Sequence, residues 1–162
     1  MLLNLNKNGI QMKRVYHLSD DLKIDTEQVA LTQALTLDSS RPLMGLKGTH
    51  GLFASPEWWA NIDQKKMPLS FISGVIQRTY IAGQDNGDEP NGMILQQDDG
   101  STQDVGIYVN TPTDIPLFKP GSLVEVVYVL DELKRQPGAD GNINYSKTAL
   151  EMTVSLKPIG LS

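Results

Sequence analysis

Hydrophobic and polar residues alternate along the second half of the chain in the way typical of β-strands. Every second residue is hydrophobic over 123–130 and again over 150–156, and a period of two turns one side of a strand toward a core. Shorter segments with the same preference precede them, separated by turns rich in Gly, Asp or Pro. The pattern predicts five strands, at residues 69–81, 93–97, 105–109, 123–130 and 150–156.

The same pattern indicates which side chains form the core. One face of each of the last two predicted strands is hydrophobic, so we expect six buried side chains there: Val124, Val126, Tyr128, Leu150, Met152 and Val154. The first predicted strand is the longest and contains a single glycine, Gly74. An isolated glycine within a strand is typical of a bend or a bulge, and we expect the bend at this residue.

The pattern before residue 67 is less regular, but it contains two recognisable elements. Residues 13–18 favour a short strand, because they include a valine and a tyrosine that prefer extended structure. A helix is expected to begin at Ser55, which can cap it, with Pro56 at the first helical position. We expect this helix to end near residue 64.

Residues 27–37 fit two interpretations. Their hydrophobic residues alternate as in a strand, whereas Leu31 and Leu35 have helical spacing and Thr26 is a possible helix cap. We favour the strand, because the segment contains two β-branched threonines.

The chain of 162 residues fits one domain. No repeat or low-complexity linker divides it, so we expect a single domain over residues 1–162. Within it, residues 69–156 form the main β-structure, residues 13–67 an N-terminal elaboration, and residues 1–12 a loose extension. Met12, which two basic residues follow, is an alternative start.

Composition excludes several kinds of site. The chain has no cysteine and only two histidines, which removes disulfides, thiol nucleophiles, iron–sulfur clusters and cysteine-based zinc sites. No signal-peptide pattern and no membrane-spanning apolar run is present, so we expect a cytoplasmic protein without a membrane partner.

The negative charge is concentrated in one segment. The net charge is −5, but residues 84–104 contain six acidic residues and no lysine or arginine. The rest of the chain carries 14 basic and 19 − 6 = 13 acidic residues, so the acidic character does not exclude a polyanionic ligand on another surface.

Two sequence stretches resemble a known fold family. The stretch MILQQDDGSTQDVGIYV, at residues 93–109, resembles the strand–turn–strand unit of OB-fold proteins that bind single-stranded nucleic acid. The stretch FKPGSLVEVVYVL, at residues 118–130, resembles their turn into the fourth strand. Over residues 69–156 the resemblance implies a mainly β protein, namely a five-stranded OB-like Greek-key barrel with an N-terminal elaboration and one short helix.

The resemblance also implies a binding face on the second and third strands, flanked by the loops at residues 84–91 and 132–145. Single-strand binders combine basic side chains for phosphates with aromatic rings on which bases stack. We expect the ligand to be single-stranded DNA. The candidates for binding it are Arg78, Tyr80, Tyr108, Lys134, Arg135, Tyr145 and Lys147.

A protein–protein interaction module or assembly subunit is the alternative function. Trp58 and Trp59 are adjacent on the predicted helix, so their side chains point about 100° apart and one amphipathic face cannot bury both equally. Tryptophan is enriched among interface hot spots, which makes this pair the candidate contact with a protein partner. A homo-oligomer is compatible with the same reading.

No catalytic constellation is recognisable, and we expect a protein that is not an enzyme. Neither histidine lies near a nucleophile motif. The acidic residues at 85–89 lack the spacing of an EF-hand calcium loop. We therefore predict no catalytic residue, no metal site and no cofactor.

Overall fold

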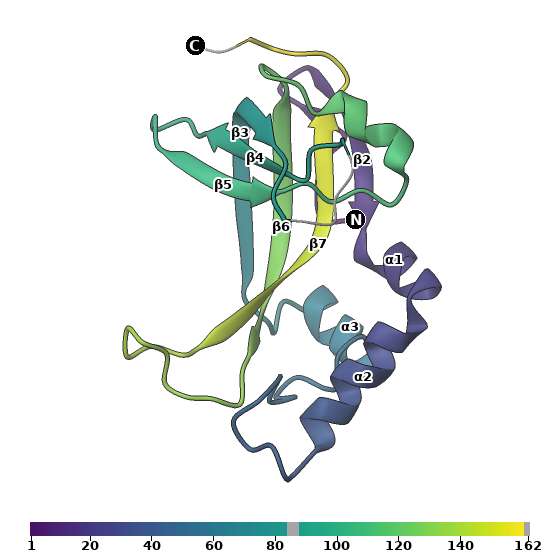
Figure 1. Ribbon diagram of the computed structural model, residues 1–162, viewed down its shortest axis with the longest axis vertical. Helices are drawn as coiled ribbons and strands as arrows, with labels where there is room; N and C mark the ends of the chain where they lie inside the picture. The colour runs from purple at the N-terminus through teal and green to yellow at the C-terminus, as the bar shows by residue number, and fades with distance from the viewer. Residues whose placement is uncertain (84–87, 161–162) are drawn as a thin grey trace. The chain divides into compact units, whose positions relative to one another are not determined.

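The computed structural model describes residues 1–83 and 88–160 (Figure 1). The chain forms two compact units, each built from segments that are far apart in the sequence. Unit 1 comprises Met1–His17, Phe71–Val127 and Ala149–Ser162, and unit 2 comprises Leu18–Ser70 and Tyr128–Thr148. The single domain expected over residues 1–162 stays a prediction.

The protein is mainly β, as the alternating pattern predicts. Seven strands form one open antiparallel sheet, in the order β1-β2-β7-β6-β3-β4-β5. The strands are β1 Asn6–Lys7, β2 Ile10–His17, β3 Leu69–Tyr80, β4 Gly92–Gln96, β5 Thr102–Gly106, β6 Leu123–Glu132 and β7 Tyr145–Ser155. All five strands predicted over residues 69–156 are present, although the third begins and ends about three residues earlier than expected.

The closed five-stranded barrel is not confirmed. Such a barrel of β3–β7 needs hydrogen bonds between its outermost strands, which in the observed order are β5 and β7. The edge of β7 that would pair with β5 in a closed barrel is instead paired with β2, with Met12 opposite Ser155 and Arg14 opposite Thr153. A strand from the N-terminal part of the chain thus occupies the edge that closure requires.

The core of unit 1 lies largely on β6 and β7. The six side chains expected to be buried on these two strands are buried, and five of them belong to unit 1. The opposite faces are buried as well, since Val127 and Thr153 have no exposed surface. These strands are central in the sheet order, and strands covered on both faces lose the simple alternation of inside and outside.

The bend expected at Gly74 stays a prediction, but the irregularity in the pairing of β3 lies two residues further along the strand. The register between β3 and β4 shifts between Ile76 and Arg78. Gly74 has another role: a Cβ atom there would lie 2.8 Å from the carbonyl oxygen of Gln96 and 2.9 Å from Cβ of Leu95. The glycine therefore permits the close approach of β4 to β3.

The first residues of unit 1 are tied to β7. The backbone N–H groups of Leu2 and Leu3 donate hydrogen bonds of 2.9–3.0 Å to the buried carboxylate of Glu151, and the side chain of Leu3 is buried. Lys7 forms a 2.6 Å ion pair with Glu125. These contacts hold the segment that the sequence analysis treats as a loose extension.

Unit 2 contains three α-helices, α1 Leu18–Ile24, α2 Thr26–Leu37 and α3 Pro56–Asp63; a 3₁₀ helix, η1 Pro112–Leu117, belongs to unit 1. The strand favoured over residues 27–37 is wrong, because this segment is α2. Its N-cap is Asp25, whose side chain accepts a 3.1 Å hydrogen bond from the backbone of Gln28. This cap satisfies one of the free N–H groups at the helix start.

The helix predicted from Ser55 is confirmed. The side chain of Ser55 accepts a hydrogen bond from the N–H of Trp58, and Pro56 is the first helical residue. Trp58 and Ile62 on α3 are buried, as is Phe53 just before it, and the rings of Phe53 and Trp58 pack edge to face with centroids 5.0 Å apart. No helix among the described residues is long and apolar enough to span a membrane.

Candidate functional site

Three of the residues predicted to bind nucleic acid lie in unit 1, and two of them are neighbours on β3. The guanidinium of Arg78 lies 5.5 Å from the ring centroid of Tyr80, so the pair expected on one side of the strand does meet. The hydroxyl of Tyr80 donates to Asp104 on β5, and this hydrogen bond raises the pKa of Tyr80. Tyr108, half-buried, packs against Tyr16 with ring centroids 5.6 Å apart.

The other four predicted residues lie in unit 2, where Lys134 has a structural role. Its ammonium group donates hydrogen bonds to the backbone carbonyls of Leu35 at 2.6 Å, Arg41 at 3.0 Å and Asp38 at 3.3 Å. Leu35 belongs to the last turn of α2, where carbonyl groups have no partner within the helix. Lys134 therefore supplies hydrogen bonds to carbonyl groups at the C-terminal end of α2 and in the loop that follows it.

The remaining three residues differ in their surroundings. Arg135 is exposed, Tyr145 is half-buried at the start of β7, and Lys147 is exposed. The ammonium of Lys147 lies 4.7 Å from the ring centroid of Tyr128, a cation–π contact within unit 2. None of these contacts identifies a shared groove for a nucleic-acid strand.

The adjacent tryptophans face different surroundings, as their helical spacing requires. Trp58 is completely buried and donates its indole N–H to Asp131 at 2.9 Å. Trp59 is half-buried, and its ring packs edge to face on Trp58. Trp58 is thus a core residue of unit 2, while Trp59 keeps part of its surface accessible.

Asp131 is a buried carboxylate beside the same tryptophan. Only one per cent of its surface is exposed, and its Oδ1 atom has no hydrogen-bond partner among the described residues. Burial raises the pKa of Asp131, an effect that the hydrogen bond from Trp58 partly opposes.

The described acidic residues of the segment at 84–104 are all exposed: Asp88, Glu89, Asp98, Asp99 and Asp104. Asp85 and the rest of residues 84–87 lie outside the described residues. The hydroxyl and N–H of Ser101 bond to Asp99 and lower its pKa, so this carboxylate stays charged. The hairpin turn expected at residues 98–101 is confirmed, with Gly100 in the left-handed conformation.

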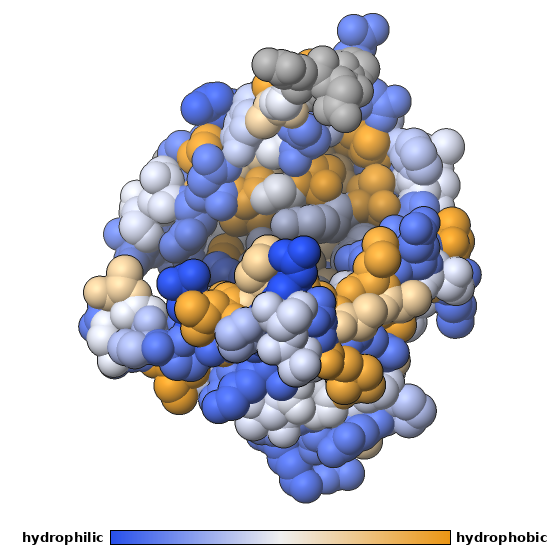
Figure 2. Space-filling model, turned by 60° about the horizontal axis from the view of Figure 1, so that its bottom comes forward, coloured by the Kyte–Doolittle hydropathy of each residue, from blue (hydrophilic) through white to orange (hydrophobic). Residues whose placement is uncertain are grey.

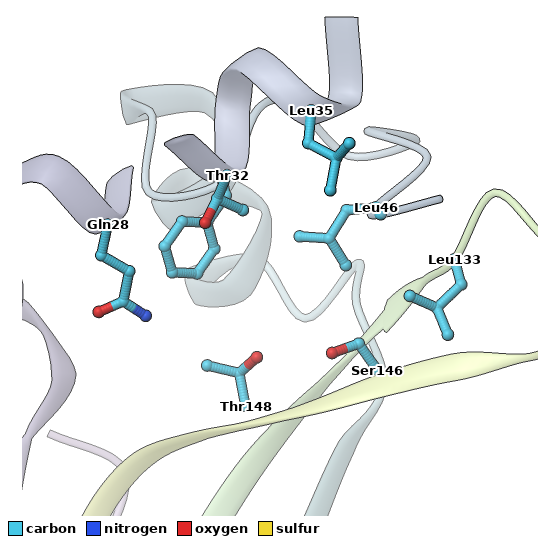
Figure 3. Close-up of a pocket in the computed structure, with 9 residues that line it drawn as sticks. Gln28, Thr32, Leu35, Leu46, Leu133, Ser146 and Thr148 are labelled. Atoms are coloured by element: carbon cyan, nitrogen blue, oxygen red, sulfur yellow. The ribbon is translucent and has the colours of Figure 1, made fainter. Parts of the chain in front are cut away.

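Unit 2 contains a pocket of about 280 Å³ that the sequence analysis does not identify (Figure 3). Polar side chains line part of it: Gln28, Thr32, Ser146 and Thr148. Hydrophobic side chains line the rest: Leu35, Leu46, Phe53 and Leu133. In Figure 3 both groups point into the same space.

The pocket could have been found only with α2 recognised as a helix. Gln28, Thr32 and Leu35 follow a spacing of four and then three residues, which puts them on one face of a helix. In a strand the same residues would not share a face, because residues 28 and 32 would lie on one face and residue 35 on the other. The described residues contain no group of three His, Cys, Asp or Glu placed to hold a metal ion.

Comparison with known protein families decides between the two functional readings. The model of the family described as "Immunity protein RhsI2" matches residues 12–155. The chain belongs to this family. Comparison with curated proteins finds no match. The family match covers all of unit 2 and most of unit 1, and it includes both stretches that resemble OB-fold proteins, residues 93–109 and 118–130.

This finding corrects two predictions. Assignment to the OB-fold single-strand binders is wrong, because the family is one of toxin-immunity proteins. The predicted binding of single-stranded DNA is wrong for the same reason. The alternative, a module that binds a protein partner, agrees with the family.

Proposed function

We propose that this protein is an immunity protein that binds a polypeptide toxin and thereby neutralises it. The family match over residues 12–155 carries this proposal. Binding alone suffices for the function, so the expectation of a protein that is not an enzyme stands as part of the proposal. A cytoplasmic location and a homo-oligomeric state remain predictions.

The exposed hydrophobic side chains of unit 2 support the proposal of a protein partner. Six large hydrophobic side chains of this unit are at least half exposed: Ile24, Leu31, Leu37, Leu43, Met44 and Ile143. None of the residues of α2 is fully buried. Figure 2 shows hydrophobic side chains exposed among hydrophilic ones on the face that it presents. Where such hydrophobic side chains form a contiguous patch with polar residues around it, they are typical of interaction surfaces.

The charge of the chain indicates how a partner is recruited. The net charge is −5, and the described acidic residues of the segment at 84–104 are exposed. Complementary charge accelerates the encounter of two proteins and weakens as salt is added. We therefore propose that the toxin presents a basic surface and that association slows as ionic strength rises.

A neutralisation assay tests the proposal. Polypeptide toxins encoded by the source organism are expressed one at a time in a susceptible host, with and without this chain. We expect the chain to restore growth against one toxin and the purified pair to form a stable complex. The proposal fails if the folded chain restores growth against none of them.

A further inference from the structure

The pocket of unit 2 has rigid walls. Leu46 and Leu133 form an antiparallel bridge, and the N–H of Lys134 donates to the carbonyl of Gly45 at 3.0 Å. The ammonium of the same lysine donates to the carbonyl of Leu35 on α2. Lys134 thus joins α2 to the loop at Gly45, and this fixes two sides of the pocket before any ligand binds.

Two further contacts fix the position of α2. Gln33 donates its side-chain amide to the backbone carbonyl of Phe53 at 2.8 Å, and Phe53 lines the pocket. Gly45 has a φ of +87°, and a Cβ atom there would lie 2.7 Å from Cγ of Leu35. Only glycine allows this close approach in this backbone conformation. A preorganised pocket pays less to bind its occupant.

The pocket has a polar part and an apolar part. The side chains of Gln28, Thr32, Ser146 and Thr148 make no hydrogen bond within the described part of the chain, and Figure 3 shows that the labelled ones point inward. The leucines and the phenylalanine supply the apolar part. An occupant that satisfies both parts has a flat or branched apolar body and one neutral hydrogen-bonding tip.

The lack of charge in the pocket lining and the volume of the pocket restrict which chemical groups can occupy it. No ionisable side chain lines the pocket, so a charged group would enter without a counter-charge and lose its hydration. The volume of about 280 Å³ lies just below the range of roughly 300–1,000 Å³ usual for small-molecule sites. It is therefore suited to a single side chain of a partner protein. Tyrosine combines a neutral ring with a hydroxyl, and it is enriched among interface hot spots.

The geometry points to this pocket as the receptor for a tyrosine side chain of the toxin. This inference rests on the proposed function, because it names the part of the surface that the toxin contacts. The tyrosine ring packs on Leu35, Leu46, Phe53 and Leu133. Its hydroxyl exchanges hydrogen bonds with the polar residues at the other part of the pocket.

A matched pair of tryptophan variants in unit 2 tests the inference. Thr32→Trp places a large ring in the pocket, whereas Asp63→Trp adds the same ring at an exposed position at the end of α3, away from the residues proposed to contact the toxin. We expect Thr32→Trp to weaken binding of the neutralised toxin by about 30-fold or more, the loss typical of a hot spot. Asp63→Trp should bind like the wild type. Circular dichroism and thermal melting confirm that both variants are folded.

A second variant keeps the test valid if Thr32→Trp does not fold. Thr148→Val removes one hydroxyl and preserves side-chain shape, and we expect it to weaken toxin binding by about fivefold. The inference is overturned if folded Thr32→Trp, or Thr148→Val in its place, binds the toxin as tightly as the wild type.

A probe without the toxin separates this inference from the proposed function. N-acetyl-L-tyrosinamide should shift the NMR methyl signals of Leu35, Leu46 and Leu133 saturably, and N-acetyl-L-lysinamide should shift them much less. No shift with the tyrosine compound contradicts the pocket assignment. If the wild type neutralises no toxin, the proposed function fails whatever the probe shows. If the wild type neutralises a toxin and the pocket variants bind that toxin equally tightly, only the pocket assignment fails.

Discussion

The indole N–H of Trp58 donates a 2.9 Å hydrogen bond to the carboxylate of Asp131, and both side chains are buried in unit 2. The other carboxylate oxygen has no partner among the described residues. Trp58→Phe keeps an aromatic ring at this position but removes the hydrogen bond from the indole to the buried carboxylate. We expect the free energy of unfolding to fall by about 1–3 kcal/mol, the cost of an unsatisfied buried group. Urea denaturation measures this change, and a loss below about 0.5 kcal/mol would show that the bond contributes little.

The raised pKa of Asp131 predicts how stability depends on pH. Because the folded state binds this proton more tightly than the unfolded state, whose pKa is near 3.8, the contribution of Asp131 to stability is greatest below that pH. It declines as pH rises toward the folded-state pKa. Asp131→Asn cannot ionise. We therefore expect the stability of this variant relative to the wild type to increase as pH rises from about 3.8.

Denaturation of both proteins across this pH range measures the difference directly. Above the folded-state pKa the difference should become constant. A difference that is independent of pH, or that decreases with rising pH, contradicts the assignment of the raised pKa to Asp131.

Replacing Lys134 tests its role at the end of α2. Lys134→Met keeps a long apolar chain but removes hydrogen bonds to three carbonyls. We expect a loss of about 1–3 kcal/mol, because hydrogen bonds from charged donors are the stronger ones. Arg135→Met is the control, since Arg135 is exposed and should change stability by less than about 0.5 kcal/mol. Equal effects of the two changes would contradict a special role for Lys134.

Gly74→Ala tests the close approach of β3 and β4. The added Cβ would lie 2.8 Å from a backbone carbonyl oxygen, so the strands themselves must move. We expect a destabilisation of about 1–3 kcal/mol. Gly106→Ala is a milder comparison, because the nearest atoms there belong to the side chain of Tyr108 at 3.2 Å, which can turn away. Thermal melting that ranks the two variants in the opposite order would contradict this account.

The strands could be predicted from the sequence because their pattern is local. The buried positions of β6 and β7 follow from alternation of hydrophobic residues, and the helix α3 follows from the Ser55–Pro56 cap. The barrel could not be decided in this way, since closure depends on which distant segment pairs with β7. That segment is β2, more than a hundred residues away in sequence, and no local pattern in β2 reveals the pairing.

Helix α2 shows where local preferences mislead. Its hydrophobic residues alternate, and Thr36 favours a strand by its β-branched side chain. In the helix, the hydroxyl of Thr36 instead donates to the carbonyl of Thr32, and Asp25 and Lys134 satisfy the two ends. One of these partners lies about a hundred residues away, so the segment alone could not show it. The pocket that depends on α2 was missed for the same reason.

The candidate site was only partly predictable as well. The predicted binding residues are basic and aromatic because such side chains suit nucleic acid, yet Lys134 stabilises the fold and Tyr108 packs against Tyr16. Residue type alone does not distinguish a structural cation from a ligand-binding one. The exposed hydrophobic residues of unit 2, such as Leu31 and Leu37, are apparent only once burial is known.

The most direct test of neutralisation by binding is a titration of the purified toxin with this protein, in which binding and toxin activity are measured in the same samples. The account predicts saturable binding and toxin activity that falls in proportion to the fraction bound. It also predicts slower association at higher salt. Toxin activity that is lost without formation of a complex, or a complex that leaves the toxin fully active, would contradict it.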